Sequence, residues 1–186
     1  MAVLIVYASS EGQTAKVADH LGDVLREHDV EFEEYAVGGV PGDLDLGDYD
    51  GVLLGASVHM GKHQKSMRKF VKRHREALVD AYSGFFQVSL SSASDDEQRQ
   101  REAADYVENL VDETGWEPDH VGVFGGALKF SEYGFIKGKL MKAIASGMGD
   151  VDTAADQEFT DWAEVTAFAE AFLSGLEGVD VGESAI

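Results

Sequence analysis

Small and hydroxyl-bearing residues follow directly after the apolar run 2–7, in the order Ala-Ser-Ser-Glu-Gly-Gln-Thr from Ala8 to Thr14. An amphipathic helix is predicted to begin at the end of this stretch. Backbone N–H groups point out of a helix start, and the helix dipole favours an anion there. The hydroxyls of Ser9, Ser10 and Thr14 can add further donors. The spacing therefore predicts a phosphate-binding loop, with a merely hydroxyl-capped helix start as the alternative.

Two common nucleotide-binding patterns do not fit this loop. It has no Lys, which excludes the GxxxxGK[ST] loop, and it lacks the GxGxxG fingerprint of dinucleotide sites. It does resemble the Ser/Thr-x-x-Gly-x-Thr loop with which flavodoxin-like proteins hold the phosphate of FMN. That resemblance implies FMN contacts from Ser9, Ser10, Glu11, Gly12, Gln13 and Thr14.

The charge of the chain is extreme and unevenly distributed. Two basic segments, 62–75 and 129–142, contribute +7 and +3 to a net charge of −20, so the remaining residues carry −30. An acidic surface of this kind resembles proteins of salt-loving organisms, and self-repulsion should weaken the fold in dilute salt. The basic segments indicate either ion pairing to the acidic remainder or attraction to an anionic partner or membrane surface.

Length and composition indicate one cytoplasmic domain. The 186 residues can bury a full core, and we expect a single domain over residues 1–176 with a flexible tail over 177–186. No apolar run is long enough to span a membrane, and no signal-peptide layout is visible. The chain has no Cys, which excludes thiolate chemistry and disulfides. No metal site or nucleic-acid partner is indicated, since Asp43, Asp45, Asp48 and Asp50 miss the calcium-loop spacing.

Apolar runs alternate with helical patterns, which is typical of a parallel sheet built from βαβ units. Strands are predicted at 3–7, 31–37, 51–56, 83–90 and 120–125, and helices at 13–28, 64–79, 95–113 and 161–176. In the 64–79 helix, His74 falls on the apolar face and is expected to be packed, with its ring nitrogen satisfied. These elements fit a flavodoxin-like α/β three-layer sandwich with a five-stranded parallel sheet of order 2-1-3-4-5. Ligands of such sheets bind at the carboxyl ends of the strands.

Three unusual loops are predicted to meet at that edge. Besides the first loop, they are Ser57–His63 and Ser89–Ser94, both rich in small or hydroxyl residues. We expect one side of the isoalloxazine to lie against Ala56, Ser57, Val58, His59, Met60 and Gly61, and the other against Ser89, Leu90, Ser91 and Ser92. His59 and His63 are the nearby side chains that we expect to titrate near neutrality. Each is a candidate proton relay or a contact to an anionic substrate group, with a plain loop role as the alternative.

Longer motifs resemble the menaquinone-dependent protoporphyrinogen IX dehydrogenase family. They are Leu54-Gly-Ala-Ser-Val-His-Met-Gly-Lys-His63, Phe70-Val-Lys-Arg-His74, Gly115-Trp-Glu-Pro-Asp119, Gly125-Gly-Ala-Leu128, Asp152-Thr153 and Thr160-Asp-Trp162. The resemblance covers nearly the whole chain. It implies an FMN enzyme that oxidises a porphyrinogen and passes the electrons to a membrane quinone, with peripheral contact to the cytoplasmic membrane face. No catalytic triad is expected, because the flavin performs the redox step.

The resemblance also implies an extra helical segment over 129–150, between the last strand and the last helix. Its apolar stripe could cover the site, touch a membrane, or pack on the sheet. The chain carries fewer basic and aromatic residues in this segment and in the 57–63 loop than the family pattern. Two other functions stay open: a flavodoxin-type electron carrier, whose acidic surface would dock basic redox partners, and an NAD(P)H–quinone reductase, which needs no dinucleotide motif. The sequence does not define the oligomeric state.

Overall fold

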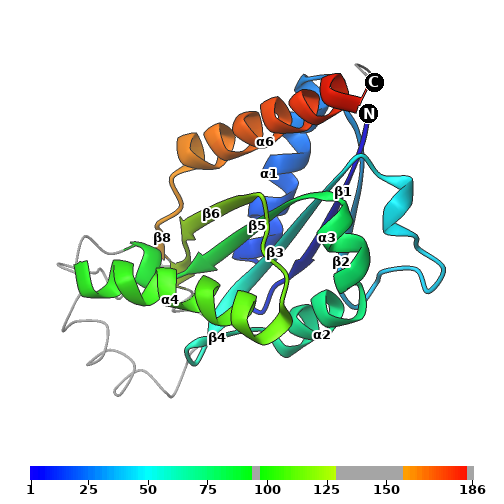
Figure 1. Ribbon diagram of the computed structural model, residues 1–186. Helices are drawn as coiled ribbons and strands as arrows, with labels where there is room; N and C mark the ends of the chain where they lie inside the picture. Colours follow the sequence, from blue (N-terminus) through cyan, green and yellow to red (C-terminus); the bar gives the residue numbers. More distant parts are fainter. Residues whose placement is uncertain (94–96, 129–156, 184–186) are drawn as a thin grey trace.

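The sheet at the centre of the molecule follows the predicted order. The structure is a computed structural model that describes residues 1–93, 97–128 and 157–183 (Figure 1). Within these residues, parallel strands pair in the order β2-β1-β3-β5-β6, with bounds β1 Ala2–Ala8, β2 Glu31–Ala36, β3 Gly51–His59, β5 Tyr82–Ser89 and β6 His120–Gly125. This is the 2-1-3-4-5 topology expected from the alternation of apolar runs and helices.

Helices cover both faces of the sheet, as Figure 1 shows. Strand β1 alternates between the two cores: Val3 and Ile5 join one buried cluster, and Leu4 and Val6 join the other. This follows from the twofold alternation of side chains along a strand. The first cluster packs under α1 (Gln13–Glu27) and α6 (Trp162–Glu183), and the second under α2 (Lys65–Arg73), α3 (Arg75–Asp80) and α4 (Glu97–Thr114). The molecule is therefore a three-layer sandwich.

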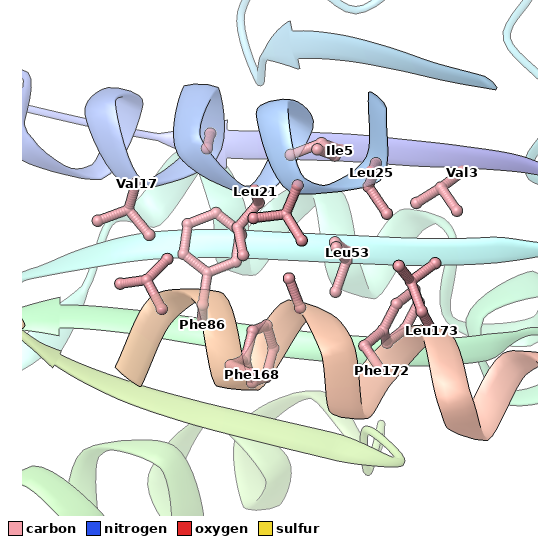
Figure 2. Packing of buried hydrophobic residues seen from close by; sticks show 14 of the residues in the cluster. Val3, Ile5, Val17, Leu21, Leu25, Leu53, Phe86, Phe168, Phe172 and Leu173 are labelled. Carbon is pink, nitrogen blue, oxygen red and sulfur yellow. The ribbon is translucent and has the colours of Figure 1, made fainter. Parts of the chain in front are cut away.

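Figure 2 shows the core between α1, α6 and the sheet. Leu21 of α1, Phe86 of β5 and Phe172 of α6 are fully buried there. Burying such side chains contributes roughly 1.5–3 kcal/mol each. This rigid core holds the carboxyl ends of the strands in fixed relative positions, and the candidate site is built on those ends.

Two predicted boundaries are wrong in instructive ways. The predicted 64–79 helix divides into α2 and α3 at His74, whose backbone (φ −106°, ψ 15°) leaves the helical region. The apolar periodicity passes through this single residue unchanged, so the pattern could not reveal the break. His74 is half-buried against the Phe70 ring at 4.5 Å between centroids, and burial lowers its pKa. The last helix continues to Glu183 instead of ending at Leu176, because the intervening glycines weaken a helix without stopping it.

Short elements join these helices and strands. A 3₁₀ turn, η1, covers Leu46–Asp48 and is capped by the Asp45 carboxylate, which accepts from the Gly47 N–H at 2.9 Å. The strands β7 (Ala127–Leu128) and β8 (Gln157–Glu158) pair antiparallel and were not predicted. The predicted 129–150 segment lies outside the described residues. No helix within the described ranges is long and apolar enough to cross a membrane.

Candidate functional site: a cavity at the carboxyl edge of the sheet

A cavity of about 320 Å³ lies at the carboxyl ends of β1, β3 and β5. It is the edge at which the three loops were expected to meet. Residues of all three contribute to its lining, which consists of Ser9, Ser10, Glu11, Gln13, Thr14, Ser57, Val58, His59, Met60, Val88, Ser89, Leu90, Gly126 and Ala127. Most of the predicted site residues thus border one concave surface.

The first loop presents a helix start to this cavity. Gly12 precedes α1 in a left-handed conformation (φ +87°), and its N–H donates to the Ser9 hydroxyl oxygen at 2.9 Å. A left-handed residue here favours glycine, because a Cβ would be strained. The first turn of α1 contains no acidic residue. The positive end of the helix dipole therefore faces the cavity without an anion from its own first turn.

Two polar atoms of this helix start lie buried without a partner among the described residues: the Gln13 Oε1 and the Thr14 Oγ1 atoms. Gln13 and Thr14 are 5% and 1% exposed. A buried polar group without a hydrogen bond costs roughly 1–3 kcal/mol, so such atoms are rare unless a ligand or water serves them. An orphaned hydroxyl donor and an orphaned amide acceptor suit a ligand that carries both a phosphate and hydroxyl groups, as FMN does.

The Gln13 side chain is held by a residue far away in the sequence. Its Nε2 donates to the Thr160 hydroxyl oxygen at 2.8 Å, and the Thr160 hydroxyl donates to the Gly125 carbonyl oxygen at 2.7 Å. This relay ties the helix start to the end of β6. Nearby, the Lys16 ammonium pairs with the Glu158 carboxylate at 2.6 Å, which lowers the pKa of Glu158. The relay directs the Gln13 carbonyl oxygen as the remaining acceptor.

The second predicted loop is a β-hairpin instead. Strand β3 continues through Ser57 and Val58 to His59, and β4 (Lys62–His63) pairs back against it. The turn residues Met60 and Gly61 both have positive φ, at +51° and +76°. These angles fit a two-residue type I′ turn. Methionine rarely adopts a positive φ, so the sequence does not predict a turn at this position. The Met60 side chain is 94% exposed at the hairpin tip.

The two histidines of this hairpin have different surroundings. His59 lines the cavity, whereas His63 is only 3% exposed and packs edge-on against Phe85. The His63 Nε2 lies 2.8 Å from the Gln87 Oε1, which can only accept, so the neutral ring donates through Nε2. Burial lowers the pKa of His63 to about 4. The expectation that His63 titrates near neutrality is therefore wrong.

Five predicted residues do not line the cavity itself. Ala56 is fully buried in β3, Gly12 and Gly61 serve as backbone turns, and Ser91 and Ser92 belong to the 3₁₀ turn η2 (Ser91–Ala93). The hydroxyl oxygens of Ser89 and Ser92 lie 2.6 Å apart, so Ser92 braces a lining residue. These residues support the cavity wall, and neighbouring residues form its surface.

Several residues at the cavity were not predicted. Val88, Gly126 and Ala127 belong to the lining. Gln64 braces the site: its Nε2 donates to the Ser10 and Ser57 hydroxyl oxygens at 2.9 and 2.8 Å. It thus joins the first loop to the end of β3. Thr160 lies within a motif that the sequence offers, but its contact with Gln13 spans 147 residues and no local pattern shows it.

Part of the basic segment 62–75 is neutralised by the acidic remainder. The Glu113 carboxylate pairs with the Arg68 guanidinium at 2.7 Å and the Lys72 ammonium at 2.8 Å. Hydrogen bonds from Lys72 and Arg68 lower the pKa of Glu113 to about 2. The ion-pairing explanation therefore holds for these two cations. In the described part of the chain, no group of three His, Asp or Glu residues is arranged to hold a metal ion.

Comparison with known proteins agrees with this geometry. A family model for the flavodoxin domain matches residues 4–154, and the chain belongs to the flavodoxin-domain family. The fold is similar to oxidised flavodoxin 1 from Bacillus cereus (TM-score 0.57, 18% identity, 94% of this chain and 98% of that one). It is also similar to a flavodoxin from the domain Archaea (TM-score 0.55, 16% identity, 95% and 99%). Membership of this family implies a flavin cofactor.

Particular relatives have a more specific name. The chain is 30% identical over 171 residues to protoporphyrinogen IX dehydrogenase [quinone] of Escherichia coli strain K12, covering 91% of this chain and 93% of that protein. It is 29% identical over 170 residues to the protein of the same name from Leishmania major, covering 91% and 73%. In both comparisons the similarity extends over most of the chain.

Proposed function

We propose that the protein is an FMN-dependent oxidoreductase that oxidises protoporphyrinogen IX or a similar flat reduced substrate and passes the electrons to a quinone. The observation that carries this proposal is the pair of orphaned atoms, the Gln13 Oε1 and the Thr14 Oγ1, at a helix start that lines the cavity. The relatives named for this activity match 91% of the chain, which supports the same function for this protein.

The phosphate of FMN would lie at the start of α1. The Thr14 hydroxyl would donate to a phosphate oxygen, assisted by the first backbone N–H groups of the helix and by the Ser10 hydroxyl. The Gln13 Oε1 can only accept, so it suits a ribityl hydroxyl instead of the phosphate. Thr160 keeps the Gln13 amide in that orientation. When bound, the flavin supplies the electron-transfer chemistry, and the chain binds and orients it.

The rest of the cavity suits a flat ring. Val58, His59 and Met60 border it on one side, and Ser89 and Leu90 on the other. None of the described lining residues is Phe, Tyr or Trp. A ring face without an aromatic cover leaves room for a flat substrate, which favours an enzyme over an electron carrier. His59 lies on the same side as Val58 and Met60 and could contact an anionic group of such a substrate.

The finer parts of the proposal concern partners and location. We infer that the porphyrinogen and the quinone are small-molecule partners and that the protein is cytoplasmic with peripheral contact to the membrane face. The segment 129–150 begins next to Ala127–Leu128, and Ala127 lines the cavity. It is accordingly proposed to be the family-specific insertion within a single FMN-binding domain.

The proposal is tested with the full chain loaded with FMN. Under anaerobic conditions, protoporphyrinogen IX should bleach the flavin absorbance, and a menaquinone analogue should restore it. Thr166→Val, which removes a hydroxyl bonded to His20 away from the cavity, is the matched control and should turn over normally. Failure of porphyrinogen to reduce the flavin, with rapid electron exchange to a protein partner, would replace this function by that of an electron carrier.

A further inference from the structure

Three cations form an exposed stripe along α2. Lys65, Lys69 and Arg73 are exposed and follow one another at intervals of four residues. This interval places them along one side of a helix, spanning roughly 12 Å at 1.5 Å per residue. The buried residues Met67, Phe70 and Val71 fix the opposite face of α2 against the sheet. The stripe therefore points away from the core.

These cations differ from the others on the same helix. Arg68 and Lys72 are paired with Glu113, whereas the described residues offer no ion-pair partner to Lys65, Lys69 or Arg73. In a chain of net charge −20, unpaired cations side by side are unexpected. Because the acidic remainder does not neutralise them, ion pairing within the chain does not explain this part of the basic segment.

The stripe begins at the mouth of the cavity. Gln64, immediately before Lys65, donates to the hydroxyl oxygens of Ser10 and Ser57, which both line the cavity. The hairpin tip adds exposed Lys62 and, beside it, Met60 with a side chain 94% exposed. Figure 1 places β4 and α2 along the same border of the molecule. One continuous surface thus joins the cavity mouth to the cations of α2.

We propose that this surface, formed by Met60, Lys62, Lys65, Lys69 and Arg73, docks on an anionic phospholipid membrane. The proposal deepens the proposed function, since it places the mouth of the flavin cavity where a lipid-soluble quinone partitions. Each basic residue near an anionic lipid surface raises the membrane affinity about fivefold. An exposed apolar side chain beside lysines fits a lipid interface, whereas a nucleic-acid backbone offers no site for Met60.

The charges next to this surface would orient the docked molecule. The neighbouring helix α4 exposes Asp105, Glu108 and Asp112, which an anionic membrane repels. Electrostatic effects of exposed charges fade over about 8–10 Å at physiological salt. The acidic charge on distant faces therefore opposes docking weakly, while attraction at α2 and repulsion at α4 favour one tilt with the hairpin tip toward the lipid.

Vesicle flotation of the FMN-loaded chain tests this surface directly. The protein should float with phosphatidylcholine vesicles containing about one-third phosphatidylglycerol at about 0.1 M salt, and not with pure phosphatidylcholine. Lys65→Gln with Lys69→Gln should weaken binding about 30-fold. The control pair Arg26→Gln with Arg101→Gln changes net charge equally, at exposed ion pairs elsewhere, and should bind like the parent.

Three results would overturn the proposal: no flotation with anionic vesicles, equal flotation with neutral ones, or an equal loss in both variant pairs. A preference of the α2 surface for single-stranded DNA or for a second copy of the chain, lost in the Lys65/Lys69 variant, would assign another partner and also overturn it. Flavin absorbance reports an intact cavity in each sample. Because flotation requires no turnover, a failure of porphyrinogen oxidation leaves the docking result readable, and the reverse also holds.

Discussion

The loop from Ser9 to Thr14 and the β3–β4 hairpin border the same cavity but differ in the hydrogen bonding of their buried polar groups. The loop leaves two buried polar atoms without partners in the described chain, the Gln13 Oε1 and the Thr14 Oγ1. In the hairpin, the buried His63 is paired with Gln87, and its carbonyl oxygen accepts from the Arg68 Nε at 3.1 Å. The loop therefore has two polar atoms that a ligand or water could serve, whereas the buried histidine of the hairpin is already hydrogen-bonded within the chain.

The largest effect is expected in the hairpin, where low pH should reduce the free energy of unfolding through His63. Folding lowers the pKa of His63 from 6.5 to about 4, because the ring is buried. A depressed histidine pKa stabilises the fold above pH 6.5, and this contribution disappears as the pH falls toward 4. It amounts to about 3 kcal/mol by pH 4.

Denaturant unfolding of the parent and of His63→Gln at several pH values measures this contribution. Gln can still donate to Gln87 but does not titrate, and both proteins share the same carboxylates. The stability advantage of the parent over the variant should therefore shrink by about 3 kcal/mol between pH 7 and pH 4. A difference that stays constant with pH would mean that His63 is accessible to protons in the fold.

The loop is tested at Thr14, whose hydroxyl has no hydrogen-bond partner among the described residues. Thr14→Val keeps the volume and removes the orphaned hydroxyl, so the ligand-free protein should be as stable as the parent or more so. FMN affinity should fall about 10- to 150-fold, because a charge-assisted hydrogen bond is lost. Isothermal titration with riboflavin, which lacks the phosphate, is the control, and equal weakening of both ligands would separate Thr14 from the phosphate.

A smaller effect is expected at Thr160, which supports the loop from a distance. Thr160→Val removes the hydroxyl that bonds the Gln13 Nε2 and the Gly125 carbonyl oxygen, at a cost of roughly 1–2 kcal/mol. FMN and riboflavin should weaken together, since Gln13 is assigned to the ribityl chain that both contain. Thr166→Val, which breaks the bond to His20 away from the cavity, is the matched variant and should leave flavin affinity unchanged. Identical affinities in both variants would confine Thr160 to a role in stability.

The smallest effect is expected at the hairpin tip, where one substitution tests the turn. Met60→Asn places a residue that tolerates positive φ before Gly61, in the most favourable sequence for a type I′ turn. Thermal unfolding should show a gain of roughly 0.5–1 kcal/mol in the free energy of unfolding. Flotation with anionic vesicles should weaken, because the exposed apolar side chain is lost. A variant that is less stable would show that the turn depends on the methionine side chain.

The sequence predicts the parts of this site that depend on local chemistry. The β6 boundaries, His120–Gly125, and the start of α1 at Gln13 agree with prediction, because a buried strand and a helix start have local signatures. The hairpin was missed because its turn rests on a left-handed methionine, which local propensity does not predict. Gln64 and Thr160 were missed for another reason: their contacts join residues up to 147 positions apart.

The central claim is that the cavity at the start of α1 holds FMN, and the flavin content of the purified chain tests it most directly. The protein should be yellow, or take up flavin when titrated, and the extracted flavin should co-elute with FMN and not with FAD. Uptake of FMN should quench its fluorescence at one flavin per chain, more tightly than uptake of riboflavin. A colourless protein that takes up no FMN even in molar salt, where we expect the acidic chain to be most stable, would contradict the account.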